Sequence, residues 1–469
     1  MPLEFYSTNH EAPKTNIRDA ILTGQAPDKG LYMPKNIPKI TDGELASLRD
    51  MDYYEQAVLI TSKLLEGYVP DEILQDLCKD AYTFNIPIEK VYDDKYIMRL
   101  DHGPTASFKD FAARLMARLM NYFLEQLGRS LLILTATSGD TGGAVADAFY
   151  GQDNVDMVVL YPKDEVSDRQ RKQMTTLGKN VTAIGIDGKF DDCQKIVKEA
   201  FADPDLKDLN LSSANSINFA RLLPQTVYYF YAYSRTTTSN DQSVIFSVPS
   251  GNFGDLMGGL IAHKMGLPVL KFIAAVNEND EFPKFLESGA YEKIEPSRNC
   301  LSNAMNVGHP SNLARLIDLY GGQLDEVGNL NKKPDMGALR KDIASVSISD
   351  VATKETIERV YDKHKTILEP HGAVGWAGLM WYLENEFERD VASKNLSLQT
   401  VNYDIDPKNT VAVSLETADP AKFPTIIREA LGIDPEMPEH LAEAQKRQET
   451  IMNMDAEYAE FKKYLLSRR

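Results

Sequence analysis

Apolar residues recur along this chain with two different spacings. Residues 108–128, FKDFAARLMARLMNYFLEQLG, carry Phe111, Leu115 and Leu119 on one face, which predicts a helix that ends at the last glycine of the stretch. The next stretch, SLLILTA at 130–136, is a short apolar run, as expected for a strand buried on both faces. These two patterns alternate over much of the chain.

Strands and helices are predicted in turn from residue 95 onward. We expect strands at 95–100, 130–136, 155–162 and 180–186, and helices at 108–128, 141–151, 167–178 and 191–203. Further along we expect a strand at 243–250, a helix at 254–266, and strands at 270–276 and 410–417. Strands that alternate with helices favour parallel sheets covered on both faces. The sequence therefore predicts an α/β fold with two parallel-sheet domains.

Three domains are predicted from these patterns. Residues 1–92 are expected to be mainly helical, 93–233 to form a smaller α/β domain, and 234–469 to form a larger one. The polar stretch SRTTTSNDQ, residues 234–242, is the best candidate for a linker. Residues 439–469 are expected to form one charged amphipathic helix that packs on the surface.

The charge balance limits the classes of partner. The chain has 469 residues, 43% of them hydrophobic, with 51 basic against 69 acidic side chains and a net charge of -18. An acidic chain without a Lys/Arg block is a poor nucleic-acid binder, and close donors must hold any anionic ligand. No run approaches the length of a membrane span, so we expect a cytoplasmic protein with no membrane partner. Both a monomer and a homodimer are compatible with the sequence.

Cysteine and histidine usage adds two expectations. The three cysteines, Cys78, Cys193 and Cys300, lie far apart in the chain, which suits free thiols in a reducing compartment. The seven histidines are scattered and none pairs at the spacing of metal ligands, so we expect no zinc site.

Three loops follow predicted strands and precede predicted helices. They are DHGPTASFKD at 101–110, TATSGDTGG at 135–143 and VPSGNFGD at 248–255. Because open α/β sheets bind ligands at the ends of their strands, these loops are the candidate site.

Lys109, in the first loop, stands at the start of a predicted helix, where the helix dipole disfavours a positive charge. This helix terminus and the aromatic neighbour Phe108 would both lower the pKa of the amine and free it as a nucleophile. The ordinary alternative is a solvated surface lysine.

The other two loops are rich in glycine and small polar residues. Residues 250–254 would let backbone N–H groups approach a phosphate, although an ordinary strand-to-helix turn is an equally good interpretation. Residues 137–142 could hold a carboxylate, but alone they are better explained as a helix N-cap formed by Asp140 or Thr141. Together, an amine nucleophile, a phosphate cradle and a carboxylate loop are what a pyridoxal phosphate enzyme acting on an amino acid requires.

Eight stretches between residues 24 and 424 match the motifs of one known family, in the same order along the chain. They are GQAPDKGLY, HGPTASFKDFA, TSGDTGGA, NSINFARLLPQ, SGNFGD, NVGHPSNLAR, EPHGAVG and TADPAKFP. In these stretches the chain resembles the threonine synthases, pyridoxal phosphate enzymes of fold type II. The resemblance implies pyridoxal 5'-phosphate as cofactor and a reaction that converts O-phospho-L-homoserine and water into L-threonine and phosphate.

The resemblance also implies a role for each matching residue. Lys109 would form the internal aldimine and move protons among the α, β and γ carbons of the substrate. The implied cofactor contacts are Lys109, Phe108 near the ring, Gly251, Asn252, Phe253, Gly254 and Asp255 at the phosphate, and Thr417 at the pyridine nitrogen. The implied substrate contacts are Thr137, Ser138, Gly139, Asp140, Thr141, Ser216, Asn218 and Arg221.

Two departures and two rival functions remain. Asp419 stands where the family would lead us to expect histidine, and Gly143 where we expect a small residue such as serine; the charge of Asp419 bears on the environment of Thr417. One rival is a related phospholyase that releases 2-oxobutyrate and ammonia, with a serine or threonine dehydratase as a more distant version. The other is a scaffold of the same fold without catalysis, which predicts a lost lysine or a broken phosphate loop.

Borohydride reduction tests the role of Lys109. We expect a yellow protein that bleaches with borohydride, because the reagent reduces an imine between cofactor and lysine, and we expect Lys109→Ala to abolish this response. The measurement is the visible absorbance before and after reduction. A colourless protein that cannot be reconstituted with pyridoxal phosphate would favour the scaffold.

Overall fold

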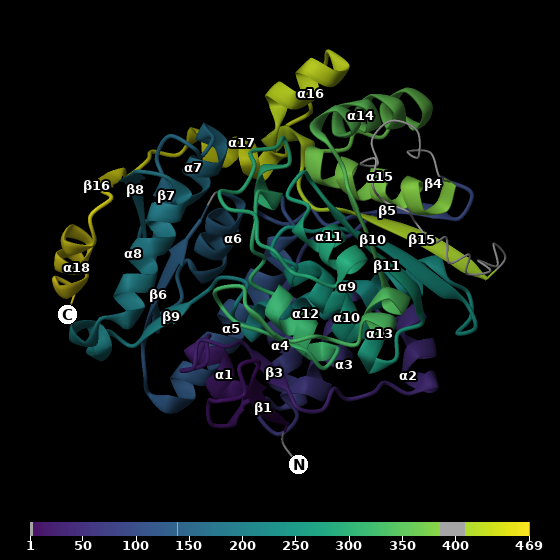
Figure 1. Ribbon diagram of the computed structural model, residues 1–469. Coiled ribbons are helices and arrows are strands. Elements are labelled where there is room, and N and C mark those ends of the chain that lie inside the picture. The colour runs from purple at the N-terminus through teal and green to yellow at the C-terminus, as the bar shows by residue number, and fades with distance from the viewer. Residues whose placement is uncertain (1–2, 138, 385–408, 469) are drawn as a thin grey trace.

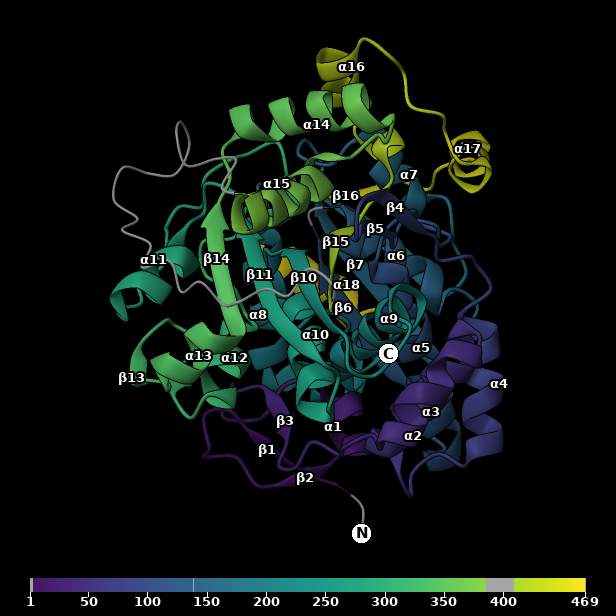
Figure 2. The same cartoon turned by 90° about the vertical axis from the view of Figure 1, so that its right-hand side faces the viewer.

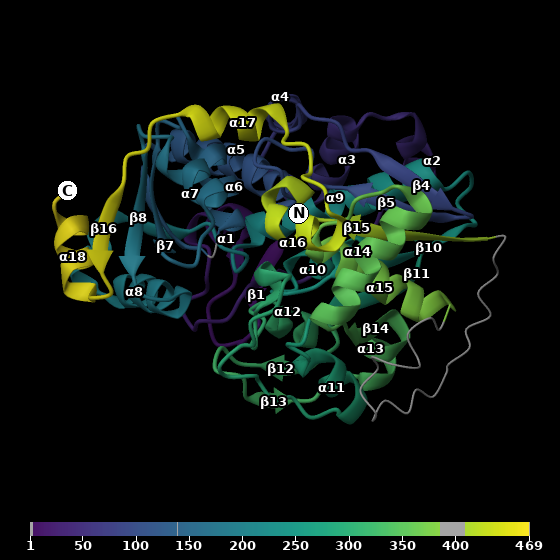
Figure 3. The ribbon, with the colours of Figure 1, turned by 90° about the horizontal axis from the view of Figure 1, so that it is seen from above.

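The computed structural model describes residues 3–137, 139–384 and 409–468 and contains two large sheets on either side of a central group of helices (Figures 1 and 3). The five-stranded sheet is parallel and has the order β16 (Met452–Asp455), β8 (Val181–Asp187), β7 (Val155–Pro162), β6 (Leu131–Ala136) and β9 (Leu211–Ser213). The six-stranded sheet has the order β14 (Ile343–Ser347), β11 (Val269–Val276), β10 (Ser243–Pro249), β15 (Thr410–Glu416), β5 (Lys95–Arg99) and β4 (Ile88–Tyr92). Its pairs are parallel except that β4 runs antiparallel to β5. The predicted α/β fold with two parallel-sheet domains is confirmed.

Helices fill the space between the sheets and cover their outer faces (Figure 2). The central group is α5 (Lys109–Leu127), α6 (Asp140–Phe149), α9 (Phe219–Thr236) and α10 (Gly254–Met265). The outer face of the six-stranded sheet carries α14 (Asp350–His364), α15 (Pro370–Glu384) and α16 (Pro424–Leu431). The outer face of the five-stranded sheet carries α8 (Phe190–Ala202) and α18 (Tyr458–Leu466), while α7 (Asp168–Thr175) contacts α6 and α17 (Glu439–Lys446).

The strands of both sheets are buried on two faces. In β10, Val244 and Phe246 belong to the central core, whereas Ile245 belongs to the core under α15. In β7, Val159 belongs to the central core and Leu160 to the core under α8. Because successive side chains point to opposite faces of a strand, two-sided burial requires the continuous apolar runs that the sequence shows.

The first 92 residues contain a small sheet beside their helices. They contain α1 (Ile17–Thr23), α2 (Asp42–Ser47), α3 (Tyr53–Leu65) and α4 (Asp71–Ala81). They also contain an antiparallel sheet of β2 (Thr15–Asn16), β1 (Glu4–Ser7) and β3 (Tyr32–Pro34). Strands of two to four residues are too short to show a period-two pattern, which is why the sequence did not reveal them.

A further group of short elements lies beside the six-stranded sheet. It comprises α11 (Glu281–Ser288), α12 (Leu313–Leu319), α13 (Met336–Asp342), and a two-stranded sheet of β12 (Gln323–Leu324) and β13 (Leu330–Lys332). Four 3-10 helices complete the described chain: η1 (Leu48–Asp50), η2 (Pro204–Leu209), η3 (Asn303–Met305) and η4 (Pro420–Lys422). Of these, η3 and η4 bear on the site.

The two large sheets do not follow the predicted domain boundaries. Strand β5 falls inside the range 93–233 but pairs with β15 of the six-stranded sheet. Strand β16 falls inside the range 234–469 but pairs with β8 of the five-stranded sheet. Sheet neighbours are set by the path of the chain in space, so contiguous ranges cannot describe either sheet, and the division 1–92, 93–233 and 234–469 stays a prediction.

The prediction of one helix over 439–469 is wrong. This segment forms α17, then strand β16, then α18. Strand β16 adds to the open edge of β8, so its backbone groups are hydrogen-bonded in the sheet rather than in a helix. Phe461 and Leu465 of α18 are buried in the core that α8 shares with the sheet.

The predicted linker at 234–242 is a short, packed connection. Helix α9 continues to Thr236, and β10 begins at Ser243. Arg49 donates hydrogen bonds to the backbone oxygen and hydroxyl of Thr237, at 3.3 and 3.1 Å, and to the side chain of Asn240 at 2.8 Å. These contacts tie the connection to the N-terminal helices, so it does not act as a free linker between domains.

The described residues contain three cysteines and no disulfide bond. Cys78, Cys193 and Cys300 are all free, and the first two are buried. Within the described residues, no helix has the length and apolar character that crossing a membrane requires.

Replacement of Phe461 tests whether α18 is part of the five-stranded domain. Phe461→Ala removes a buried ring, so we expect a loss of about 3–5 kcal/mol in unfolding free energy. Lys463→Ala, on the exposed face of the same helix, is the control and should change stability by less than about 0.5 kcal/mol. The measurement is urea unfolding followed by circular dichroism. Equal midpoints for the two variants would contradict the packing of α18.

Candidate active site

Backbone hydrogen bonds join the loop before Lys109 to the loop after β15. Leu100 donates to the backbone oxygen of Glu416 at 2.9 Å, and Phe108 donates to that of Thr417 at the same distance. Asp419 donates in return to the backbone oxygen of Ala106 at 3.1 Å. Because α5 begins immediately after this contact, the position of Lys109 relative to the second loop is set by the main chain.

Lys109 is the first residue of α5, as predicted, and its amine is enclosed. Its side chain is 13% exposed, and Nζ lies 3.9 Å from Asp140 Oδ2 and 5.3 Å from the centre of the Phe108 ring. Burial lowers the pKa of Lys109, and the cations of Lys422 and Arg221 lower it further against the attraction of Asp140. Lys109 is therefore not the solvated surface lysine of the alternative interpretation.

Asp140, the first residue of α6, is the closest carboxylate to Lys109 among the described residues. Its Oδ1 forms an ion pair with Lys422 Nζ at 2.7 Å and accepts a hydrogen bond from Gln170 Nε2 at 2.9 Å. Burial alone would raise the pKa of Asp140, but the charges of Lys422 and Lys109 and these hydrogen bonds hold it well below its usual value. Asp140 is therefore a buried, ionised carboxylate.

The hydroxyl- and glycine-rich turn before α6 is organised by Thr137. Its Oγ1 accepts hydrogen bonds from the backbone N–H groups of Gly139 and Gly142 at 3.0 and 2.8 Å. Thr137 therefore caps the start of α6, a role that the sequence led us to expect of Asp140 or Thr141. Gly139 has a φ of 135°, and a Cβ there would lie 2.5 Å from the Gln170 amide. Thr141 is partly exposed in the first turn of α6. Ser138 lies outside the described residues.

The glycine loop at 250–254 connects β10 to α10. Phe253 has a φ of 60°, and α10 begins at Gly254, so the first N–H groups of this helix have no partner within the helix. A Cβ at Gly251 would lie 2.8 Å from the backbone oxygen of Ala304 in η3. The loop is therefore closely packed, and the first N–H groups of α10 have no partner within the helix, which suits a phosphate cradle.

Two side chains of this loop make structural contacts. Asn252 Oδ1 accepts from the backbone N–H and hydroxyl of Ser311 at 3.4 and 3.3 Å. Asp255 Oδ1 accepts from the hydroxyls of Tyr228 and Tyr229 at 2.5 and 2.6 Å, and burial raises the pKa of Asp255 to about 6. Asp255 thus ties α10 to α9, and the cofactor contact predicted for it stays a prediction.

The three residues predicted near the substrate phosphate have different environments. Arg221 is buried, donates to the backbone oxygen of Ala214 at 2.8 Å, and makes no ion pair with any described residue, while its Nε has no hydrogen-bond partner. Asn218 accepts from the backbone N–H of Ala220 and donates to the backbone oxygens of Ile21 and Ser213, so both hydrogens of its amide are used.

The Asn218 side chain forms a helix cap, and the substrate contact predicted for it stays a prediction. Its oxygen caps the N-terminus of α9, and both hydrogens of its amide are used to hold α1 and the loop before α9. Ser216 is partly exposed, and its hydroxyl lies 3.4 Å from that of Ser311, beside the glycine loop.

Thr417 lies at the end of β15 and is connected to two residues that the sequence interpretation did not single out. Its hydroxyl donates to Glu369 Oε1 at 3.3 Å. Glu369 Oε2 accepts from the His371 ring at 2.5 Å, and the other ring nitrogen of His371 accepts from the backbone N–H of Ala304 at 3.1 Å. Because the backbone N–H of Ala304 can only donate, Nε2 of His371 is the acceptor and the ring carries its proton on Nδ1. These contacts connect Thr417, through Glu369 and His371, to η3, which packs against Gly251.

The two departures from the family pattern have local explanations. Asp419 caps η4 by accepting from the backbone N–H of Ala421 at 2.7 Å, and burial raises the pKa of Asp419 to about 6. A Cβ at Gly143 would lie 3.1 Å from Gln173 Oε1, so a serine there would be tightly packed. Among the described residues, neither Asp419 nor Gly143 forms a hydrogen bond or ion pair with Lys109 or with the glycine loop.

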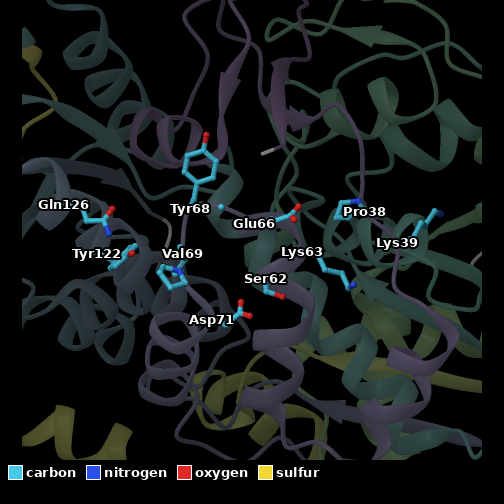
Figure 4. A pocket seen from close by; sticks show the side chains of 12 residues that line it. Pro38, Lys39, Ser62, Lys63, Glu66, Tyr68, Val69, Asp71, Tyr122 and Gln126 are labelled. Atoms are coloured by element: carbon cyan, nitrogen blue, oxygen red, sulfur yellow. The ribbon is translucent and has the colours of Figure 1, made fainter. Parts of the chain in front are cut away.

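A large hollow on the surface lies elsewhere (Figure 4). It has a volume of about 820 Å³ and is lined by residues of α3, α4 and α5 together with the segment around Lys39. It shares no residue with the Lys109 cluster, and its Lys63 is already paired with Glu44 at 2.7 Å. We assign it no role in the site.

Family profiles and solved structures match this chain along its length. The profile described as "Pyridoxal-phosphate dependent enzyme" matches residues 89–394, "Threonine synthase N terminus" matches 4–82, and "Threonine synthase, C-terminal" matches 398–465. A threonine synthase of Buchnera aphidicola is 36% identical over 99% of this chain and 100% of its own.

Two solved threonine synthases have the same fold. The pyridoxal-phosphate-bound enzyme from Brucella melitensis has a TM-score of 0.87 and 34% identity, over 99% of this chain and 98% of its own. The enzyme from Escherichia coli has a TM-score of 0.84 and 34% identity, over 99% of this chain and 100% of its own.

Replacement of Gly251 tests the glycine loop. Gly251→Ala places a methyl group 2.8 Å from a backbone oxygen, which forces the loop to shift, so we expect at least about a tenfold loss in affinity for pyridoxal phosphate. Gly43→Ala is the control, because a Cβ there meets nothing within 4 Å. The measurement is fluorescence titration of cofactor-free protein. An unchanged affinity for Gly251→Ala would show that the loop does not hold the cofactor.

Proposed function

We propose how this chain works from one premise: it belongs to the threonine synthase family of pyridoxal-phosphate-dependent enzymes. Its substrate is O-phospho-L-homoserine, and its products are L-threonine and inorganic phosphate. The observation that carries the proposal is the buried amine of Lys109, which lies beside the ionised carboxylate of Asp140. The segment before Lys109 is joined to the loop of Thr417 by main-chain hydrogen bonds. An amine of lowered pKa in this setting is suited to bind a carbonyl cofactor and to accept protons.

The residues present fit pyridoxal phosphate. The cofactor phosphate would bind at the glycine loop, where the closely packed Gly251 and the free N–H groups at the start of α10 form a cradle. Lys109 would hold the carbonyl group of the cofactor through its amine, and Thr417 would lie at the pyridine nitrogen. When bound, the cofactor supplies an electron-withdrawing ring that stabilises negative charge on the substrate carbons.

Thr417 and Glu369 would set the electronic environment of the ring. Thr417 presents a hydroxyl rather than a carboxylate, and Glu369 orients this hydroxyl by accepting a hydrogen bond from it at 3.3 Å. A neutral partner leaves the ring less electron-withdrawing than an acidic partner would, which suits a reaction that also proceeds at the β and γ carbons.

The turn of Thr137 and the cation of Arg221 would bind the substrate. The N–H groups at the start of α6 would face its carboxylate, as helix N-termini do for anions. Arg221 is a buried cation without an ion pair among the described residues, and a phosphate dianion would supply its missing counter-charge. Ser216 lies close enough to the glycine loop to take part.

Lys109 would perform the proton transfers. Its Nζ takes protons from Cα and then Cβ of the substrate, after which the bond between Cγ and the phosphate oxygen breaks and phosphate leaves. Protons return to Cγ and Cα, and water adds its oxygen at Cβ. Burial lowers the pKa of the amine, which favours its proton-accepting form, and limits the access of other water molecules.

Product analysis tests the proposed reaction. The full-length protein with pyridoxal phosphate is incubated with O-phospho-L-homoserine, and threonine, 2-oxobutyrate and phosphate are quantified together. We expect one threonine for each phosphate, no turnover in Lys109→Ala, and unchanged turnover in Lys195→Ala, an exposed lysine of α8. Oxobutyrate in place of threonine would identify a phospholyase, and no phosphate release would overturn the substrate assignment.

Replacement of Arg221 tests the phosphate site. Arg221→Gln removes the charge, so we expect kcat/KM to fall by about 30-fold or more, which corresponds to about 2 kcal/mol for a hydrogen bond to a charged group. The exposed Arg129→Gln is the matched control and should leave kcat/KM unchanged. The variant should also lose its affinity for inorganic phosphate as a competitive inhibitor. Wild-type values for Arg221→Gln would place the substrate phosphate elsewhere.

A further inference from the structure

A second buried lysine stands behind the carboxylate that faces Lys109. The side chain of Lys422 is 1% exposed, and its Nζ lies 2.7 Å from Asp140 Oδ1 and 3.0 Å from the backbone oxygen of Thr105. Asp140 Oδ2 faces Lys109 Nζ at the longer distance of 3.9 Å. One carboxylate is therefore shared by two amines, and it is closer to Lys422.

The position of Lys422 is fixed from both sheets. It ends η4, which follows β15 of the six-stranded sheet and is capped by Asp419. Arg169 of α7, on the five-stranded sheet, donates to the backbone oxygen of Ala421. Gln173 of α7 donates at 3.1 Å to the same Thr105 oxygen that Lys422 uses. The amine is thus held where the two sheets meet.

Titratable groups act on Lys109 from four different elements. They are Asp140 of α6, Lys422 of η4, Arg221 of α9 and Glu369 just before α15, with the Phe108 ring beside the amine. The oxygens of Glu369 accept from Thr417, Gly372 and His371, at distances between 2.5 and 3.3 Å. Asp140 is the anion whose second oxygen still faces Lys109.

The balance between the protonated and neutral forms of the Lys109 amine depends on whether Asp140 is paired with Lys422. An anion close to an amine favours its protonated form, and a cation close to it favours the neutral form. Lys422 lies 2.7 Å from Asp140 and opposes the attraction that this carboxylate exerts on Lys109, offsetting part of it. Without Lys422, the full charge of Asp140 would act on Lys109 alone.

The groups around Lys422 itself do not offer it a replacement partner. Its charge also acts on Asp110, on Asp419 and on His440 of α17. The carboxylate of Asp110 accepts from the backbone N–H and hydroxyl of Thr105, and that of Asp419 caps η4. Asp140 therefore carries the ion pair.

We propose that Lys422 is a positioning residue that keeps the Lys109 amine neutral by occupying the carboxylate of Asp140. The inference rests on the proposed role of Lys109 as cofactor-binding lysine and proton acceptor. A neutral amine is the form that attacks a carbonyl and that accepts a proton from a substrate carbon. Placing one cationic group next to another is an established way to obtain such a lysine.

Proton titration of Lys109 in charge variants tests the inference. In full-length protein freed of cofactor, the rate at which trace acetic anhydride labels Lys109 is measured against pH by mass spectrometry. Lys422→Met should raise the midpoint by about 1 pH unit, because Asp140 then acts on Lys109 alone. Asp140→Asn should lower it, and the double variant should return it close to the wild-type value.

Two controls isolate the effect of the local charge. Lys422→Arg keeps the cation, so it should leave the Lys109 midpoint within a few tenths of a pH unit of wild type. Lys195→Met removes one charge from an exposed site, where the side chain is 75% exposed, and should not move the midpoint. In cofactor-loaded full-length protein without substrate, any pH-dependent absorbance should shift in the same directions.

An unchanged midpoint in folded Lys422→Met would overturn the inference and leave Lys422 a structural residue. Should that variant fail to fold, Asp140→Asn decides: a midpoint that does not fall would equally overturn it. The proposed function is judged separately by borohydride trapping of pyridoxal phosphate on Lys109 in the wild-type protein. Loss of trapping would refute that function, whereas successful trapping with an unmoved midpoint refutes the role of Lys422 alone.

Discussion

The site depends on the backbone contact between the loop after β5 and the loop after β15. Main-chain hydrogen bonds from Leu100 to Glu416, and from Phe108 to Thr417, place two distant parts of the chain side by side. Because Lys109 begins a helix at the end of the first loop, its amine has a fixed starting point before any rotamer is chosen. A reacting group needs to be held within a fraction of an ångström, and rigid main chain achieves this better than side-chain packing alone.

The electrostatics of the site run against those of the whole protein. The chain carries a net charge of -18, yet two buried lysines, Lys109 and Lys422, lie against the carboxylate of Asp140, and the charge of Arg221 acts on Lys109 from α9. Charges on the surface are screened over about 10 Å of salt solution, whereas buried groups a few ångströms apart are screened much less. The few buried cations therefore decide what an anionic ligand experiences once it has entered.

The sequence revealed those parts of the fold and site whose cause is local. The apolar runs of β7 and β10 are visible because burial on two faces demands them, and Lys109 and Gly251 lie in motifs whose residue types state their chemistry. Strands of two to four residues, and the strand β16 inside a helical pattern, form because of partners far away in the sequence. For the same reason Lys422, Gln170 and Glu369 were not singled out, and the helix cap formed by Asn218 was not anticipated.

The late position of β16 has a consequence for the order in which the protein can be completed. The ribosome releases β6, β7 and β8 long before residues 452–466, which supply the edge strand and the helix α18 of the same sheet. At ordinary rates of synthesis this interval is on the order of tens of seconds. Throughout it, β8 presents an unpaired edge and part of an apolar face, which other chains could join. A nascent chain of this kind needs protection, by early collapse or by a chaperone, until its last residues have emerged.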